Sequence, residues 1–170
     1  TFLVNFIAIC GILLSKKSFI SARVQSGDLQ IFLYDLSAPA GMQTGGKDLE
    51  LLEKLKEYGV DVDAAVARFV GKKDLYTKFL LKFLDDTSYN GLAESIENQK
   101  YPEAFEYAHS LKGVCGNLNL SPLTEQVTEM TEILRNKDTL SGEEQQRIQE
   151  IMPVMAKSYE EIIQILEENE

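Results

Sequence analysis

The sequence predicts an all-α protein, in which short N-terminal helices precede an antiparallel four-helix bundle. Apolar residues recur at helical spacing almost throughout from Lys47 onward. The loops between the four longest predicted helices are short, which favours antiparallel packing of neighbouring helices. Apolar residues also make up 44% of the chain. This share is enough to fill the core of a bundle and excludes general disorder.

Residues 1–46 differ in character from residues 47–170, which we take as the bundle domain. The first part begins with FLVNFIAICGILL, an uncharged run shorter than the roughly 20 residues of a membrane span. No basic region precedes this run, as one would in a signal peptide. A strand-like stretch, LQIFLYDL, and a loop-like stretch, SAPAGMQTGG, follow. We expect an appended or wrongly assigned leader, residues 1–41, before a working protein that starts near Met42. A membrane or export segment and a packed extension are the alternatives.

The bundle domain opens with two short predicted helices and one long one. DLELLEKLKEYG has apolar residues at helical spacing, and Gly59 ends it. DAAVARFVG forms a second helix that ends at Gly71. A long helix is predicted from about Asp74 to Gln99, and the residues TSYNG at 87–91 could bend it.

The next two predicted helices each have a proline in the first turn. Pro102 fits this position because its missing N–H would have no partner there in any case, and the helix runs to about Leu118. Ser121 is predicted as the N-cap of the following helix, with Pro122 at its first position. That helix is expected to end near Asn136.

The last predicted helix starts with a capping box and ends near Glu168. Ser141 and Glu144 have the spacing at which each side chain bonds the other residue's backbone N–H. Pro153 lies well inside this helix and should kink it.

The distribution of charge argues against binding to nucleic acid. The formal net charge is −10. Residues 1–41 carry three basic and two acidic residues, a net of +1, so the remaining residues carry −11. A body with this charge would repel a phosphate backbone.

The cysteines and the histidine predict no disulfide framework and no metal site. Cys10 and Cys115 lie far apart, in regions of different character. With a single histidine in the chain, no cluster of metal ligands can be assembled around them. We therefore expect a reducing, cytoplasmic setting.

The histidine, His109, is predicted to face solvent. Steps of 100° per residue place an apolar stripe on one side of its helix. The members of this stripe are Ala104, Tyr107, Ala108, Leu111, Val114, Cys115 and Leu118. His109 falls on the opposite side, within about 60° of Phe105, Glu106, Lys112, Gly113 and Gly116. A buried, hydrogen-bonded core histidine is disfavoured by this geometry.

The neighbours of His109 are typical of a reactive site rather than of an inert surface. Gly113 and Gly116 each cost roughly 1 kcal/mol of helix propensity, yet they remove side chains from the surface beside the ring. A partner could then approach closely. Lys112 can reach an anion on the ring, and Phe105 offers an apolar contact at the rim, unless the N-terminal helices cover it. A neutral imidazole is a competent nucleophile towards phosphorus at physiological pH.

These residues resemble the motif of the histidine-containing phosphotransfer (HPt) domain, H-x-L-K-G. His109, Leu111, Lys112 and Gly113 match it, and Cys115 stands at the usual small-residue position. The stretch VDVDAAVARFVGKKDLYTKFLLKFLDD is similar to the family's entry helices, so the resemblance covers about residues 48–168. The family usually has glycine ten residues after the histidine, where this chain has Asn119. We expect a left-handed conformation there, which asparagine tolerates next best.

The resemblance implies that the chain is a phosphocarrier of two-component signalling rather than an enzyme with its own turnover. His109 would accept a phosphoryl group from the aspartyl phosphate of a response-regulator receiver domain and pass it to another. Lys112 would steady its charge, while Gly113, Gly116 and Phe105 would contact the partner. No cofactor is expected on the chain itself, because Mg²⁺ would be held by the receiver. Receiver domains and a hybrid histidine kinase are the expected partners, a monomer suffices, and no membrane contact is expected unless residues 1–17 act as an anchor.

Three other functions compete with the phosphocarrier. An independent enzyme is disfavoured because Cys115 lies on the buried side, poorly placed to pair with His109, and because no Gly-rich phosphate loop is present. The chain could instead be the phospho-accepting domain of a larger histidine kinase. It could also be an adaptor that binds receivers without carrying phosphate, although the intact motif argues against this.

Overall fold

The computed structural model describes residues 18–25, 28–35 and 46–169. The chain divides into two compact units, Thr1–Gln43 and Thr44–Glu170.

The described part of the first unit is a β-hairpin. Strand β1 spans Ser18–Gln25, and strand β2 spans Asp28–Asp35. The two strands pair antiparallel from Ser18 opposite Asp35 to Gln25 opposite Asp28. The strand-like stretch LQIFLYDL falls on β2. The suggested anchor at residues 1–17 lies outside the described residues.

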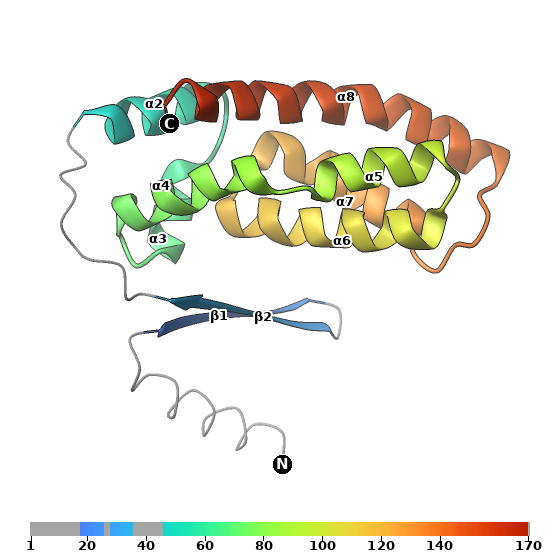
Figure 1. The fold of residues 1–170 in the computed structure, drawn as a ribbon, viewed down its shortest axis with the longest axis horizontal. Coiled ribbons are helices and arrows are strands. Elements are labelled where there is room, and N and C mark those ends of the chain that lie inside the picture. The colour runs from blue at the N-terminus through green and yellow to red at the C-terminus, as the bar shows by residue number, and fades with distance from the viewer. Residues whose placement is uncertain (1–17, 26–27, 36–45, 170) are drawn as a thin grey trace, which may run out of the picture. The chain divides into compact units, whose positions relative to one another are not determined.

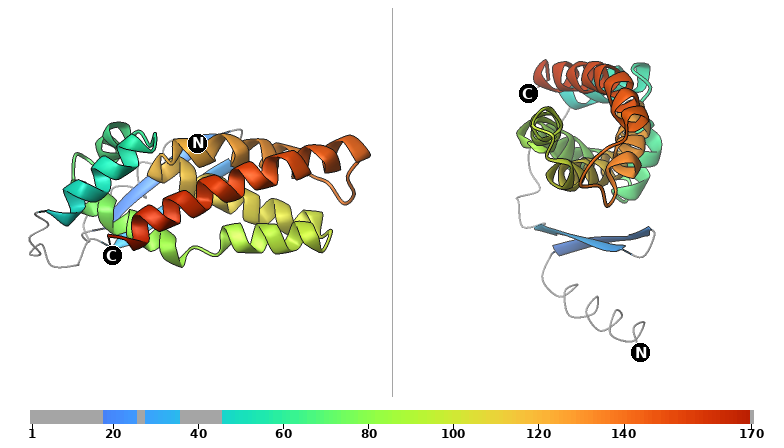
Figure 2. Two further views of the ribbon diagram at one scale, coloured as in Figure 1. Left: turned by 90° about the horizontal axis from the view of Figure 1, so that it is seen from above. Right: turned by 90° about the vertical axis from the view of Figure 1, so that its right-hand side faces the viewer.

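The second unit is helical, as Figures 1 and 2 show, and the predicted all-α bundle is confirmed. Three short N-terminal helices lead into the bundle, and a 3-10 turn joins the third of them to the next helix. The elements are α2 (Lys47–Glu57), α3 (Val62–Arg68), α4 (Lys73–Leu81), η1 (Lys82–Asp85), α5 (Ser88–Glu97), α6 (Tyr101–Leu118), α7 (Ser121–Leu134) and α8 (Gly142–Glu167).

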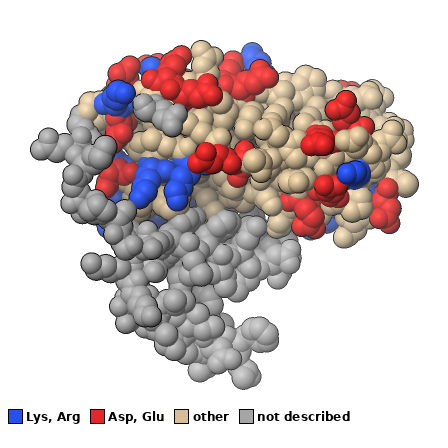
Figure 3. Space-filling model, viewed as in Figure 1, with Lys and Arg blue, Asp and Glu red and all other residues tan. Residues whose placement is uncertain are grey.

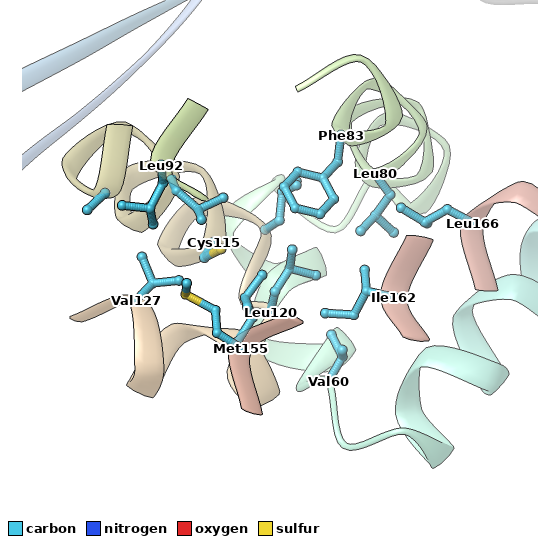
Figure 4. Packing of buried hydrophobic residues seen from close by; sticks show 14 of the residues in the cluster. Val60, Leu80, Phe83, Leu92, Cys115, Leu120, Val127, Met155, Ile162 and Leu166 are labelled. Carbon is cyan, nitrogen blue, oxygen red and sulfur yellow. The ribbon is translucent and has the colours of Figure 1, made fainter. Parts of the chain in front are cut away.

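The bundle closes through consecutive neighbours around one apolar core. Helix α5 packs on α6, α6 on α7, and α7 on α8. The ring closes where α8 returns to α5 and η1, because the Tyr159 ring stacks on Tyr89 at 4.0 Å and meets Phe83 edge-on at 5.7 Å. Figure 4 shows the core between these helices, with Leu92, Cys115 and other buried side chains pointing inward.

The predicted long helix from Asp74 to Gln99 is not continuous. Helix α4 passes into η1, and the chain becomes extended at Asp86, where ψ is 122°. The Asp86 carboxylate then accepts a hydrogen bond of 2.8 Å from the Ser88 backbone N–H. Because this bond satisfies a backbone donor in the first turn, it favours a new helix start over a bend.

The start of α7 also differs from the prediction, whereas the start of α8 agrees with it. Ser121 is the first residue of α7, Leu120 is the N-cap, and the Ser121 hydroxyl donates to the Asn119 carbonyl. The predicted N-cap role of Ser121 is therefore wrong, because its side chain accepts no bond from the helix N-terminus. The capping box of Ser141 and Glu144 is confirmed in both directions, at 3.2 and 2.8 Å.

The N-terminal helices are joined to the bundle by buried and polar contacts. Helix α2 lies against α8, where Tyr58 donates a 2.7 Å hydrogen bond to Glu161 and Lys54 pairs with Glu168 at 3.2 Å. On α4, the buried Tyr76 hydroxyl donates a 2.9 Å bond to the carbonyl of Leu118 at the end of α6. Together these contacts fix the entry helices against two sides of the bundle.

Candidate functional site

Helix α6 carries the candidate site, and its two ends are set by local sequence. Pro102 stands in its first turn, as predicted. At the other end Asn119 adopts the predicted left-handed conformation, with φ 57° and ψ 38°. The Asn119 side-chain amide also donates a 2.9 Å bond to the carbonyl of Asp61, at the start of α3. The end of α6 is therefore tied to the N-terminal helices.

The predicted apolar stripe of α6 faces the core. Five of its members are buried, namely Ala104, Ala108, Leu111, Cys115 and Leu118. Tyr107 and Val114 are half-buried at its edges and pack against the core. The opposite face of α6, which includes His109, is turned away from the bundle interior.

His109 is half-buried rather than fully open to solvent. The Phe105 ring lies one turn earlier, with its centroid 5.9 Å from the imidazole centroid. Of the two ring nitrogens, Nδ1 is buried and has no hydrogen-bond partner. Nε2 is therefore the nitrogen that the partly exposed ring offers to an approaching reactant.

Lys112 lies one turn beyond His109 and is held by an acidic residue of α7. Its ammonium nitrogen is 3.3 Å from Glu132 Oε1. Arg135 binds the same carboxylate through both oxygens, with Nε at 3.0 Å from Oε2 and Nη2 at 2.9 Å from Oε1. Hydrogen bonding from Arg135, supported by Lys112, lowers the pKa of Glu132 to about 2, so the carboxylate is ionised at neutral pH.

Phe105 lies at the rim of the site beside a cation. The Arg135 guanidinium carbon lies 5.7 Å from the Phe105 ring centroid, a cation–π distance. Phe105 is half-buried and packs against the core. Arg135, Phe105 and His109 thus follow one another along the surface between α6 and the end of α7.

A neighbouring helix contacts the backbone of one of the two glycines beside His109. Gly113 and Gly116 are both half-buried. The carbonyl of Gly116 accepts a hydrogen bond from Arg68 Nη1, so α3 reaches this end of the α6 surface. A partner that approached Gly116 would therefore also meet Arg68.

Cys115 takes no part in a nucleophilic pair with His109. It is a free, fully buried cysteine. Burial raises the pKa of its thiol, which keeps the thiol neutral and unreactive. The burial agrees with the prediction that Cys115 lies on the core side of its helix, poorly placed to pair with His109.

Two further classes of feature are not found among the described residues. Within residues 18–25, 28–35 and 46–169, no three His, Cys, Asp or Glu side chains are grouped closely enough to hold a metal ion. In the same part of the chain, none of the helices combines the length and the apolar character needed to cross a bilayer.

The fold and this surface define a helical-bundle protein that displays a single partly exposed imidazole beside a lysine. The family model described as "Hpt domain" matches residues 80–167, more than half of the chain. The chain therefore belongs to the Hpt domain family. The match includes η1 and α5–α8 but leaves α2, α3 and most of α4 outside. No curated protein and no solved structure matches the chain.

Membership of this family places the chain in phosphotransfer of two-component signalling. Hpt domains are phosphocarriers rather than catalysts, and they interact with receiver domains and histidine kinases.

Sequence reasoning did not identify Glu132 and Arg135 as neighbours of the motif. Their spacing of three residues predicts a local ion pair at the end of a helix. The sequence contains no signal that this pair meets Lys112 and Phe105, because that contact depends on the register of α7 against α6.

Proposed function

We propose that this protein is a phosphorelay carrier in which His109 is the phospho-acceptor. The observation that carries the proposal is the half-exposed His109 ring, whose Nδ1 is buried while Nε2 is left for reaction. The ring stands on a helix held rigidly between the core and two neighbouring helices. A nucleophile on such a helix keeps a fixed orientation towards an incoming partner.

The transfer needs one bond exchange at phosphorus in each direction. The lone pair of Nε2 attacks the phosphorus of an aspartyl phosphate on a receiver domain, and a bond forms between Nε2 and phosphorus. The bond between phosphorus and the aspartyl oxygen breaks, and the aspartate leaves as a carboxylate. The Lys112 ammonium, one turn away, offsets the negative charge of the phosphoryl group. Attack by an aspartate of a second receiver reverses these changes.

The receiver supplies the groups that this surface does not. We expect Mg²⁺ to be bound by the receiver and no cofactor to be needed by the carrier. The partners would be response-regulator receivers and a hybrid histidine kinase in the cytoplasm. A monomer would be sufficient, because one exposed α6 surface meets one receiver at a time. Gly113 and Gly116 would allow close approach of the receiver, with Phe105 at the edge of the contact.

The test is transfer of radiolabelled phosphate from phospho-receivers to the full chain. We expect label on the wild type that is lost in acid and survives base, as phosphohistidine does and phosphoserine does not. The variant His109→Gln should take no label while it keeps the helical circular-dichroism signal and melting temperature of the wild type. Ser110→Ala, a change at the adjacent exposed hydroxyl, is the matched control and should label normally.

Three results would contradict the proposal. Binding to receivers without any label on the wild type would indicate an adaptor that carries no phosphate. Label that persists on His109→Gln would show that another residue is the acceptor. A large loss of stability in His109→Gln would show that the ring contributes mainly to packing.

A further inference from the structure

Glu132 binds Lys112, the cation that a phosphoryl group on His109 would need. Its Oε1 is shared by two donors, Lys112 Nζ at 3.3 Å and Arg135 Nη2 at 2.9 Å. Its Oε2 accepts a second bond from Arg135 at 3.0 Å. The carboxylate is thus held firmly by Arg135 and more weakly by Lys112.

The contact between Arg135 and Glu132 has a fixed geometry. A guanidinium that binds both oxygens of a carboxylate has a defined geometry, and the Arg135 guanidinium also lies on the Phe105 ring at 5.7 Å. Lys112 makes a single, longer contact with Glu132 through its own flexible side chain, and 24% of that side chain remains exposed. Lys112 is therefore the cation that can leave Glu132 at the lower cost.

We propose that Glu132 is a positioning residue that holds Lys112 beside His109 in the unphosphorylated protein and yields it to the phosphoryl group. This inference rests on the proposed phosphorylation of His109. A phosphoryl group on Nε2 carries more negative charge than a carboxylate and binds the Lys112 ammonium in competition with Glu132. Arg135 stays with Glu132, so the carboxylate keeps a partner when Lys112 moves.

Other charged groups near α6 do not replace Glu132 in this role. On α6 itself, Glu106 is exposed. On α7, Glu129 pairs with Arg147 of α8 at 2.6 Å. Other charged residues of α4, α5 and α7 are exposed, as Glu132 itself is, but among the described residues Lys112 makes its ion pair with Glu132 and with none of these: Lys73, Asp74, Lys78, Glu94, Glu97 and Glu125.

The test uses chemical phosphorylation, so that no receiver is needed. Phosphoramidate is the donor: Nε2 attacks phosphorus, the bond between phosphorus and nitrogen of the donor breaks, and ammonia leaves. The second ionisation of the phosphoryl group, whose ordinary pKa is about 6, is then followed by the ³¹P chemical shift between mildly acidic and mildly alkaline pH. His109→Gln, which should stay unlabelled, identifies the signal.

We expect Glu132→Gln to lower the pKa of the phosphoryl group by about 0.5, since Lys112 no longer has a competing anion. Glu129→Gln, one turn earlier on α7, is the matched control and should leave that pKa unchanged. Lys112→Ala should raise it, and Glu132→Gln should have a much smaller effect in the Lys112→Ala background. This dependence on Lys112 is what distinguishes positioning from direct repulsion.

Two outcomes would overturn the inference. Glu132→Gln could behave as Glu129→Gln does, or its effect could be the same with and without Lys112. Either result would leave the proposed function intact if receivers still label His109. Conversely, the expected shifts without any transfer from receivers would contradict the proposed function and leave the role of Glu132 standing.

Discussion

Replacement of Asn119 by alanine or glycine distinguishes two features that stabilise the end of helix α6, its left-handed backbone and its side-chain hydrogen bond. The residue has a φ of 57°, and its side-chain amide donates a 2.9 Å hydrogen bond to the Asp61 carbonyl. Alanine would lose this bond, at about 1 kcal/mol. It would also lose the local hydrogen bonding of the short polar side chain that makes the left-handed region tolerable for asparagine, at about 1 kcal/mol more. Glycine loses only the bond because it adopts this conformation freely. We therefore expect Asn119→Ala to lower the free energy of unfolding by about 2 kcal/mol and Asn119→Gly by about 1 kcal/mol.

The assay is urea denaturation of the full chain followed by circular dichroism at 222 nm. The slopes of the transitions should be equal, so that the midpoints report stability alone. In thermal melts the alanine variant should unfold roughly 4–8 °C below the wild type. Glycine as destabilising as alanine would refute the reasoning, because the left-handed backbone would then contribute nothing. Equal stability of all three proteins would show that the bond to Asp61 adds nothing either.

Three further changes test the bundle itself. Gly91→Ala should destabilise by about 1–3 kcal/mol in urea, because the new Cβ would lie 2.5 Å from the Tyr107 ring and overpack α5 against α6. Ser141→Ala should cost about 1 kcal/mol in the same assay through loss of the α8 cap. The Glu144 pKa is lowered to about 2 by its bonds to Lys137 and Ser141. The ionised Glu144 side chain therefore contributes its full stabilisation above the ordinary pKa of a glutamate, and this stabilisation is lost as pH falls towards 2. Acid titration of Glu144→Gln should lack this loss, and the same acid loss in both proteins would contradict the assignment.

The features of the bundle that a few consecutive residues determine could be predicted from the sequence. Pro102 marks the first turn of α6, and Ser141 with Glu144 forms the expected capping box. The left-handed conformation of Asn119 followed from its place just beyond the helix end. In each case the physical cause, a missing donor or a strained φ, lies within one turn of the residue concerned.

Features that depend on contacts between helices could not be predicted in this way. Helical spacing placed His109 opposite the core, but it left open how far neighbouring elements would cover the ring, which is half-buried in the fold. The salt bridge of Lys112 to Glu132 needs the register of α7, which periodicity leaves open. Likewise, the sequence around Gly91 indicates a possible bend in a helix, whereas in the fold Gly91 allows the close approach of the Tyr107 ring.

The break between η1 and α5 at Asp86 depends both on local sequence and on contacts between helices. A helical pattern continues across residues 74–99, so periodicity alone favours one helix. The alternative, in which the Asp86 carboxylate caps a new helix, is local but competes with continued helix at similar cost. Tertiary contacts decide it: the break lets η1 and α5 both face α8, where Phe83 and Tyr89 meet Tyr159.

The contacts of α6 argue that the folding unit which carries the site is larger than the range matched by the family model. Residues 80–167 omit α2 and α3, yet Leu51 and Leu55 of α2 are almost wholly buried in the same core as Leu111 of α6. The last turn of α6 also depends on these helices, because Arg68 bonds the Gly116 carbonyl. The buried Tyr76 hydroxyl bonds the carbonyl of Leu118. A chain cut at residue 80 would expose the apolar surface that these helices cover and leave these carbonyls without their partners. The orientation of His109 rests on the rigidity of α6, so the entry helices contribute to the site through the bonds that they make to the end of this helix.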